Sequence, residues 1–163
     1  RQGKIMMSDL SLLNDPVAQT LLTSTQLAHL AYNWTDGTPR VIPIWFHWDG
    51  KAIVMGTPIT SPKMHVIANN TKVAITIDTA TQPYLVLSIR GTASVSIVNG
   101  VAREYELAAE RYYGAEAAQG WINQVKTLFT QMARIAITPE KVSILDFEKR
   151  FPSAIAAAMS GAG

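Results

Sequence analysis

The sequence has no cysteine among its 163 residues. Disulfide bonds, thiolate nucleophiles and cysteine-ligated metal sites are therefore excluded. Its three histidines, His29, His47 and His65, fall at no spacing that would place two metal ligands on one helix. We therefore expect no metal centre, and no side chain is assigned a catalytic role.

Charge is scarce as well. Only 16% of the residues are charged, and the formal net charge is +2. No run of Lys and Arg alternates with aromatic residues, so a nucleic-acid partner is not expected. So little surface charge favours apolar surface buried between subunits, and the slightly basic balance suits a small anionic ligand.

Long apolar runs are also missing. No run approaches 18 residues, so no segment is expected to span a membrane. Residues 1–7 contain no apolar stretch of the kind found in a signal peptide, and we expect a cytoplasmic location. The length predicts a single domain over residues 1–163, with its core at about 12–148 and a loosely ordered Ala-rich tail at 152–163.

Apolar periodicity and turn residues predict a mainly β, α+β fold. Helices are expected over 16–25, 62–69, 104–114 and 115–132. Strands are expected over 26–32, 41–48, 51–57, 73–78 and 84–98, followed by a closing hairpin of 133–138 and 141–147 around Pro139-Glu140. Gly91 inside a predicted strand indicates a bulge or a barrel corner. Because strands follow strands without regular helical crossovers, we predict an antiparallel barrel of six to seven strands with short flanking helices.

Residues 57–63 gather hydroxyl groups and a cation where a helix is predicted to begin. Thr57, Thr60 and Ser61 supply hydroxyls, Lys63 supplies a charge, and the helix starting at Pro62 adds free N–H groups. These groups favour a phosphate or carboxylate site. The alternative is an ordinary serine cap followed by a solvated lysine.

The strand before this segment has features that suit a flat ring. A flavin-type ring needs an apolar surface and main-chain groups along one edge, and a proline such as Pro43 is typical of an edge strand. The residues in question are Arg40, Val41, Ile42, Pro43 and Trp45. A plain core strand is the alternative, with Trp45 and Trp48 as core or interface residues. Arg90 could face an anion or a partner subunit, or form a surface salt bridge.

Taken in order, these motifs resemble a known family. The order is Pro-Arg-Val-Ile-Pro-Ile-Trp-Phe, an Asp-Gly hairpin, Gly-Thr, Ser-Pro-Lys, Asn-Asn, Val-Ala-Ile-Thr-Ile-Asp and Arg-Gly-Thr-Ala. It resembles the pyridoxamine 5′-phosphate oxidase-like superfamily of FMN-binding split β-barrels over roughly residues 12–148. The resemblance implies a homodimer with the cofactor in a groove between subunits. Residues 40–45 would follow the ring edge, Thr57, Ser61 and Lys63 would hold the phosphate, and Trp121 or Arg90 would help the partner chain close the groove.

The chain departs from true pyridoxamine phosphate oxidases, because the basic substrate-phosphate site and a C-terminal Arg-x-His signature near 147–152 are missing. Vitamin B6 oxidation is not expected. The chain looks more like small family members, some of which use coenzyme F420 in place of FMN. Its few basic groups near the groove, Lys63 with Lys72 and Arg40, favour FMN over the longer F420 tail.

The function expected from the resemblance is an FMN-binding oxidoreductase that transfers hydride between the cofactor and a small molecule. That substrate would enter over Trp45 and Met55. An F420-dependent reductase is one alternative. Another is a non-catalytic module that binds a flavin, or haem through His29, His47 or His65, and a third is a structural dimer with an empty groove.

Overall fold

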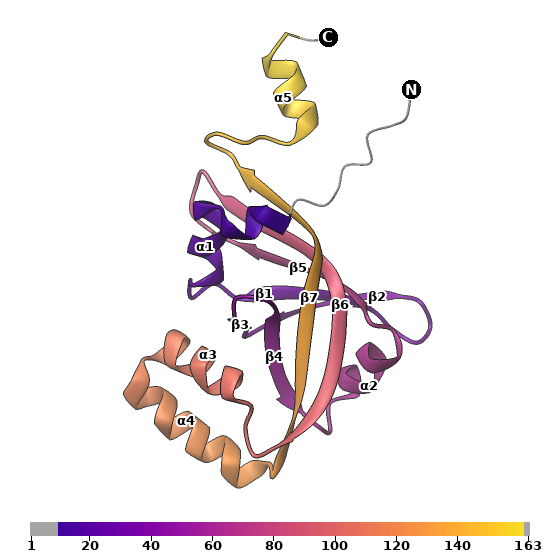
Figure 1. The fold of residues 1–163 in the computed structure, drawn as a ribbon, viewed down its shortest axis with the longest axis vertical. Helices are drawn as coiled ribbons and strands as arrows, with labels where there is room; N and C mark the ends of the chain where they lie inside the picture. The colour runs from indigo at the N-terminus through magenta and orange to yellow at the C-terminus, as the bar shows by residue number, and fades with distance from the viewer. Residues whose placement is uncertain (1–9, 162–163) are drawn as a thin grey trace.

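The structure, a computed structural model, describes residues 10–161. The strands are β1 (Ala28–Asn33), β2 (Pro39–Ile44), β3 (His47–Trp48), β4 (Ile53–Pro58), β5 (Lys72–Asp78), β6 (Leu85–Asn99) and β7 (Gln131–Asp146). The helices are the short 3-10 helix η1 (Leu10–Asn14), α1 (Pro16–Leu22), α2 (Pro62–Asn69), α3 (Arg103–Tyr113), α4 (Ala115–Leu128) and α5 (Ser153–Met159). Within these residues the strands form one antiparallel sheet in the order β2-β1-β5-β6-β7-β4-β3 (Figure 1).

The sheet curls into a split barrel because its two edge strands are neighbours in the sequence. Only Trp45 and Phe46 separate β2, at one edge, from β3, at the other. A chain step of three residues spans at most about 10 Å, so the two edges must lie close together. Phe46 is fully buried at this crossing. The predicted mainly β, α+β split barrel is confirmed.

This crossing corrects the predicted strand over 41–48. The strand breaks at Trp45 and Phe46, and β2 pairs with β1 rather than with β4. Only the two residues of β3 pair with β4, through His47 opposite Val54 and Trp48 opposite Ile53. The break occurs where Phe46 turns into the core and its carbonyl accepts a hydrogen bond from Arg111 of α3. The strands predicted over 41–48 and 51–57 therefore do not pair along their length as one hairpin.

The predicted closing hairpin around Pro139-Glu140 is also wrong, because Gln131–Asp146 is a single strand paired along β6. Its register shifts between Arg90 and Gly91, where Glu140 is the extra residue of a β-bulge. A Cβ on Gly91 would lie 2.2 Å from the Thr138 carbonyl oxygen, so only glycine allows the backbones to approach this closely. The strand therefore accommodates Pro139-Glu140 in a β-bulge instead of a turn. A bulge at Gly91 was one of the two features predicted there.

Helix boundaries follow local signals at their starts. Asp15 caps α1 by accepting a hydrogen bond of 2.9 Å from the Val17 N–H, and Pro16 is its first residue, as predicted. The helix predicted to run to 132 ends at Leu128, because Gln131 begins β7. Helices α3 and α4 lie on one side of the sheet and α2 on the other in Figure 1. A Cβ on Gly56 of β4 would lie 2.9 Å from the Tyr105 ring, so this glycine lets α3 pack closely on the sheet.

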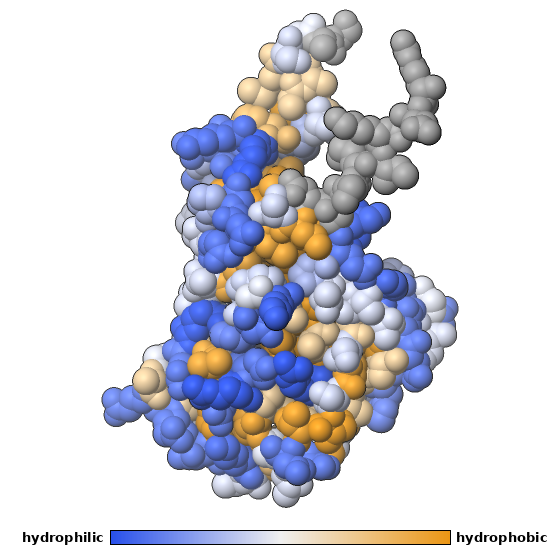
Figure 2. Space-filling model, in the orientation of Figure 1, coloured by the Kyte–Doolittle hydropathy of each residue, from blue (hydrophilic) through white to orange (hydrophobic). Residues whose placement is uncertain are grey.

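The main core fills the barrel. Its largest fully buried side chains include Leu21, Leu30, Ile75, Ile89 and Ile135. Apolar residues also reach the surface in separate patches divided by hydrophilic ones (Figure 2).

Helix α5 has no buried residue and extends away from the barrel (Figure 1). Loose order of this tail stays a prediction, and the expectations for residues 1–7 and for 162–163 lie outside the described residues. None of the described helices is long and apolar enough to cross a membrane.

Candidate functional site

The hydroxyl-rich segment lies between the end of β4 at Pro58 and the start of α2 at Pro62. We call Thr57, Thr60, Ser61 and Lys63 the phosphate corner. The Ser61 N–H donates to the Pro58 carbonyl at 2.9 Å, which turns the chain into the helix. Ser61 stands at the N-cap, but its side chain makes no capping bond and instead accepts from Lys63 Nζ at 3.0 Å. The first turn of α2 therefore lacks the side-chain oxygen that usually satisfies its N–H groups.

Lys63 is held in an unfavourable place for a cation. Its side chain is half-buried, and burial lowers the pKa of its ammonium group below the ordinary value. It also lies in the first turn of α2, where the helix dipole disfavours positive charge. An anion bound at this position would relieve both effects. The phosphate corner should therefore be more stable with a bound phosphate than without one.

Thr57 adds a second unsatisfied group. Its residue is 3% exposed, and its Oγ1 has no hydrogen-bond partner within residues 10–161. Along β4 it alternates onto the same face as Ile53 and Met55, which are buried in the core. A buried hydroxyl without a partner costs stability, so a ligand oxygen that accepted its hydrogen bond would be favourable here. The residues present therefore fit a phosphate group.

The second predicted part of the site, residues 40–44, forms the edge strand β2. Its pairing with β1 runs from Pro39 opposite Asn33 to Ile44 opposite Ala28. Val41 is 66% exposed and Pro43 is exposed, whereas Ile42 and Ile44 turn toward the core. The strand thus presents an apolar outer surface beside backbone groups on its free side, which are the features expected for contact with a flat ring.

The two parts of the site are linked through one strand. Helix α2 contacts β1, and β1 pairs with β2 along its length. Arg40 reaches back over the Trp34 ring, with its guanidinium carbon 5.0 Å from the ring centroid. This cation–π contact fixes Arg40 on the hairpin between β1 and β2.

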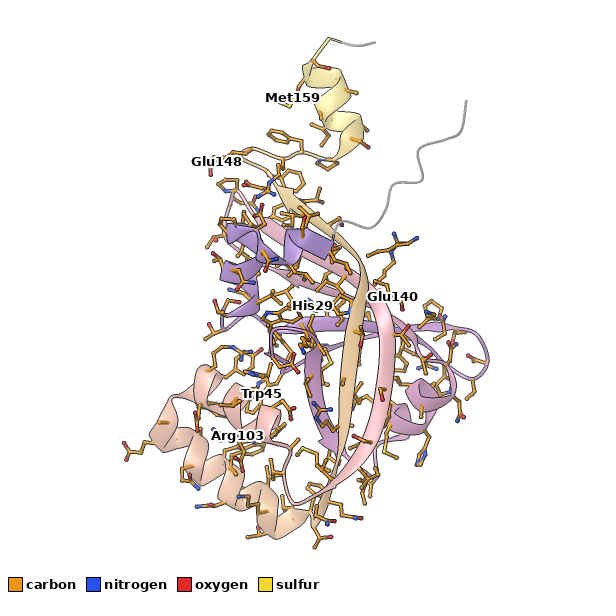
Figure 3. All side chains as sticks on the ribbon, viewed as in Figure 1. His29, Trp45, Arg103, Glu140, Glu148 and Met159 are labelled. Atoms are coloured by element: carbon orange, nitrogen blue, oxygen red, sulfur yellow. The ribbon has the colours of Figure 1, made fainter. Side chains whose placement is uncertain are left out.

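Three other predicted residues lie elsewhere. Trp45 stacks on Tyr112 with ring centroids 5.2 Å apart, and its edge contacts to Tyr113 and Trp121 have centroid distances of 5.2 and 6.4 Å. Trp121 in turn donates to the Tyr105 hydroxyl at 2.9 Å. Figure 3 places Trp45 beside α3, on the side of the sheet away from α2. Met55 is 2% exposed and lies inside the barrel, on the same face of β4 as Thr57.

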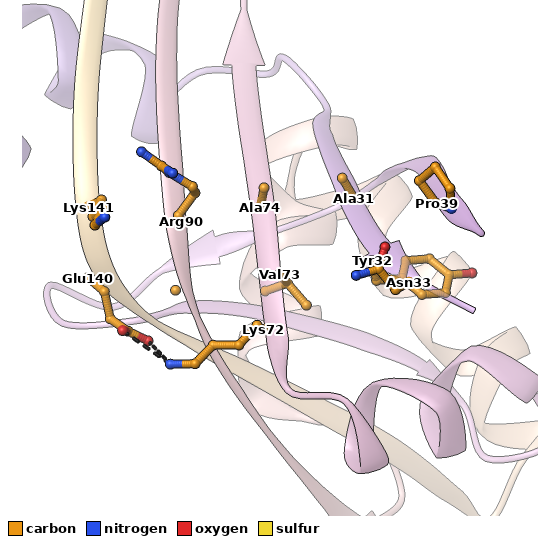
Figure 4. A pocket seen from close by; sticks show the side chains of 11 residues that line it. Ala31, Tyr32, Asn33, Pro39, Lys72, Val73, Ala74, Arg90, Glu140 and Lys141 are labelled. Atoms are coloured by element: carbon orange, nitrogen blue, oxygen red, sulfur yellow. Dashed lines mark hydrogen bonds and ion pairs between the residues drawn. The ribbon is translucent and has the colours of Figure 1, made fainter. Parts of the chain in front are cut away.

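Arg90 lies in a different setting again. It is exposed on β6 and lines a pocket of about 380 Å³ together with Lys72, Glu140 and Lys141 (Figure 4). Lys72 Nζ is paired with Glu140 at 3.0 Å. Sequence reasoning did not single out Glu140 or Lys141, because Pro139-Glu140 was interpreted as a turn. The signal that finds them is the strand register, which places Lys141 directly opposite Arg90.

One histidine, His29, contacts a carboxylate on the outer face of the sheet. His29 Nδ1 lies 3.3 Å from Asp78 Oδ1, with both side chains about half exposed. His47 lies near Arg111, and burial, followed by this positive charge, lowers the pKa of its imidazole. Within residues 10–161 no three His, Asp or Glu side chains are grouped so as to hold a metal ion.

Comparison with known proteins identifies a family model and several solved structures that share this fold. A family model described as pyridoxamine 5′-phosphate oxidase matches residues 15–146. An F420 reductase structure is 25% identical, with a TM-score of 0.58, and the match covers 77% of this chain and 94% of that one. A conserved hypothetical protein, Rv2991 from Mycobacterium tuberculosis, is 17% identical with a TM-score of 0.61, covering 90% and 89%. HutZ, a haem storage protein from Vibrio cholerae, is 14% identical with a TM-score of 0.58, covering 81% and 93%. No curated protein matched the chain.

Proposed function

We propose a function from one premise, namely that this chain belongs to the pyridoxamine 5′-phosphate oxidase family. We infer that it binds a flavin or a deazaflavin, that the cofactor is FMN, and that the protein is an oxidoreductase acting on a small molecule. The observation that carries the proposal is the phosphate corner, where the half-buried Lys63 lies in a first turn of α2 that has no side-chain cap, a few residues after the unpartnered Thr57 hydroxyl.

The phosphate would be held by this chain's own polar groups. Lys63 supplies a charge, Ser61 and Thr57 supply hydroxyl donors, and the first N–H groups of α2 add the positive end of the helix dipole. Charge-assisted hydrogen bonds of this kind are roughly twice as strong as neutral ones. The corner therefore anchors one end of the ligand and leaves its ring to be oriented by β2.

The ring would lie along the outer side of β2. Val41 and Pro43 present an apolar surface there, and the unpaired backbone groups of this edge strand can donate to or accept from polar atoms at the ring edge. When bound, such a cofactor supplies hydride-transfer chemistry, while the protein binds and orients it. Main-chain N–H donors held toward the ring edge would stabilise negative charge on the reduced ring.

A second copy of the chain is proposed to close the groove. Strand β2 is one of the two edge strands of the sheet, and the side chain of Val41 remains largely exposed there. An exposed apolar edge strand is a surface that proteins usually cover. We therefore propose a homodimer with the cofactor at the subunit interface.

Coenzyme F420 is the second candidate cofactor. The 25%-identical structure over 77% of this chain is an F420 reductase, and that relative supports the alternative. The phosphate corner serves both cofactors, because both present a tricyclic ring and a phosphate.

Absorption spectroscopy separates the candidates. The protein is purified, then incubated separately with FMN and with coenzyme F420, and free cofactor is removed by desalting. We expect the two-band visible spectrum of a flavin to remain with the protein after FMN treatment. Retention of only the single-band deazaflavin spectrum would assign F420 instead. If neither chromophore is retained, the proposed function is wrong.

A further inference from the structure

Five residues, one from each of five neighbouring strands, form a continuous row across the outer face of the sheet. The register pairs Val41 with Ala31, Ala31 with Ala74, Ala74 with Arg90, and Arg90 with Lys141. Directly paired residues project to the same face. Neighbouring strands lie about 4.8 Å apart, so Arg90 is about 14 Å from Val41, measured across the sheet.

The middle of this row is shallow because its side chains are small. Ala31 and Ala74 form part of the floor of the pocket of about 380 Å³, and Pro39 and Asn33 stand at its β1–β2 side (Figure 4). A volume of this size falls within the range of small-molecule sites. The result is an apolar trough that begins beside the proposed ring strand and ends at β6 and β7.

Two cations stand together at the far end of the trough. Arg90 and Lys141 are direct cross-strand partners, and like charges in this arrangement destabilise a sheet. Within residues 10–161 neither side chain makes a hydrogen bond or an ion pair, although Lys141 attracts the Glu140 carboxylate electrostatically. Figure 4 shows Arg90 extending from β6 toward β7, the strand that carries Lys141. The fold therefore keeps two positive charges at one place without a direct ion pair, at a cost in stability.

The nearby carboxylate makes its direct contacts with other residues. Glu140, the extra residue of the bulge, accepts hydrogen bonds from Lys72 Nζ at 3.0 and 3.2 Å and also from the Thr92 hydroxyl. Gly91 fixes the bulge, since any side chain there would meet the Thr138 carbonyl. Glu140 is thus paired directly with Lys72 and attracts Lys141 only electrostatically. The pocket is lined by three cations, Lys72, Arg90 and Lys141, and by this one carboxylate, so its charge remains positive.

We propose that Arg90 and Lys141 form an anion subsite, which takes a carboxylate or phosphate of a ligand whose apolar part lies over Ala31 and Ala74. The proposal rests on the proposed function, because Pro39 of the proposed ring strand β2 lines the trough. The anion has two possible sources, which the experiment distinguishes: an anionic tail of the cofactor itself, as in a deazaflavin, or an anionic substrate bound beside the ring.

The subsite is tested with inorganic phosphate as the probe, followed by backbone amide NMR shifts. The test variant is the double substitution Arg90→Gln and Lys141→Gln. The control is Lys51→Gln with Lys149→Gln, which removes the same charge from exposed positions outside the pocket. We expect phosphate to shift the amides of residues 90, 91 and 141 in the native protein and the control, but not in the test variant. Shifts at 57–63 should persist in all three.

Dissociation constants for FMN and coenzyme F420 then identify the source of the anion. If the tail supplies it, the test variant binds F420 about tenfold more weakly while FMN binding is unchanged, as the loss of charge-assisted contacts predicts. If the phosphate shifts are lost and both cofactors bind as before, the anion belongs to the substrate.

Two results would overturn the subsite. One is an absence of phosphate shifts at residues 90, 91 and 141 of the native protein, or equal shifts in the test variant. The other is a change from dimer to monomer caused only by the test variant, which would assign the two cations to contacts with a second copy. Failure of the proposed function looks different, because cofactor binding would be absent while the phosphate shifts at the subsite remain.

Discussion

The charge of the Lys63 ammonium group is affected by its burial, by the dipole of α2 and by the charge of a bound ligand. Its pKa is lowered from the model-peptide value of 10.5 by burial. In the folded protein the group therefore loses its proton at lower pH than in the unfolded chain, so its desolvation cost is present below the folded pKa and disappears as pH rises toward 10.5. A bound phosphate has the opposite preference, because it needs the charged form.

FMN affinity should consequently fall as pH is raised from about 7 to 10, with the decline beginning below the pKa of an ordinary lysine. The measurement is the FMN dissociation constant across this range for the native protein and for Lys63→Arg, whose guanidinium stays charged. We expect a sloping profile for the native protein and a flatter one for the variant. Identical slopes would show that Lys63 does not contact the phosphate.

Thr57 allows a prediction in which stability and binding move in opposite directions. Thr57→Val keeps the shape of the side chain and removes a buried hydroxyl that has no partner within residues 10–161. Without ligand, the free energy of unfolding should rise by about 1 kcal/mol, and FMN binding should weaken by about 1 kcal/mol. Denaturant unfolding and FMN titration measure the two effects, with Thr76→Val, at an exposed position of β5, as the control. A variant that is less stable yet binds FMN normally would contradict the assignment.

The parts of the candidate site that could be predicted are those formed by residues close together in the sequence. Ser61, Pro62 and Lys63 are neighbours in sequence, so the phosphate corner was visible as a local pattern. The burial of Met55 and the placement of Trp45 among the aromatic residues of α3 and α4 depend on tertiary packing. Lys141 joins Arg90 only through the register of two long strands, which no local pattern specifies.

At the scale of elements, the same distinction explains the fold. The helix predicted at 62–69 is observed as Pro62–Asn69, because a Ser-Pro start and an Asn-Asn end are local signals. The strand predicted over 41–48 is interrupted where the barrel closes, because the burial of Phe46 overrides strand propensity. The hairpin predicted at Pro139-Glu140 was wrong, because the strand continues through these residues and forms a β-bulge opposite Gly91 instead of a turn.

The β6–β7 ribbon gives the element-scale prediction. Gly91→Ala would place a Cβ 2.2 Å from the Thr138 carbonyl oxygen, and backbone must move to accommodate it. We expect the free energy of unfolding to fall by about 1–3 kcal/mol, the usual cost of overpacking. In Gly120→Ala, the control in α4, the new Cβ meets nothing within 4 Å, so helix propensity should raise stability by about 0.5–1 kcal/mol. Chemical denaturation compares the two, and equal effects would show that the bulge tolerates a side chain.

For the whole molecule, the low charge content and the exposed edge strand support assembly. Only 16% of residues are charged, and Val41 at the edge strand is 66% exposed. Apolar patches are visible on the face shown in Figure 2. A second copy over β2 would cover the edge and complete the cofactor groove.

We therefore expect light scattering to give a mass of twice 17.8 kDa. Val41→Glu should shift the protein toward the monomer, because it places a charge in the proposed interface. Leu128→Glu, at a residue 63% exposed at the end of α4, should leave the mass unchanged. A native monomer, or dissociation by Leu128→Glu alone, would place the interface elsewhere or remove it.

The most direct test of the central claim compares FMN with riboflavin, which has the same ring and no phosphate. Dissociation constants for both ligands are measured by flavin fluorescence with the native protein, Lys63→Ala and the exposed control Lys51→Ala. We expect the native protein and the control to favour FMN, and Lys63→Ala to reduce this preference by about 1–3 kcal/mol while riboflavin binding stays constant. An unchanged preference for FMN in Lys63→Ala would contradict the assignment of residues 57–63 as the cofactor's phosphate site.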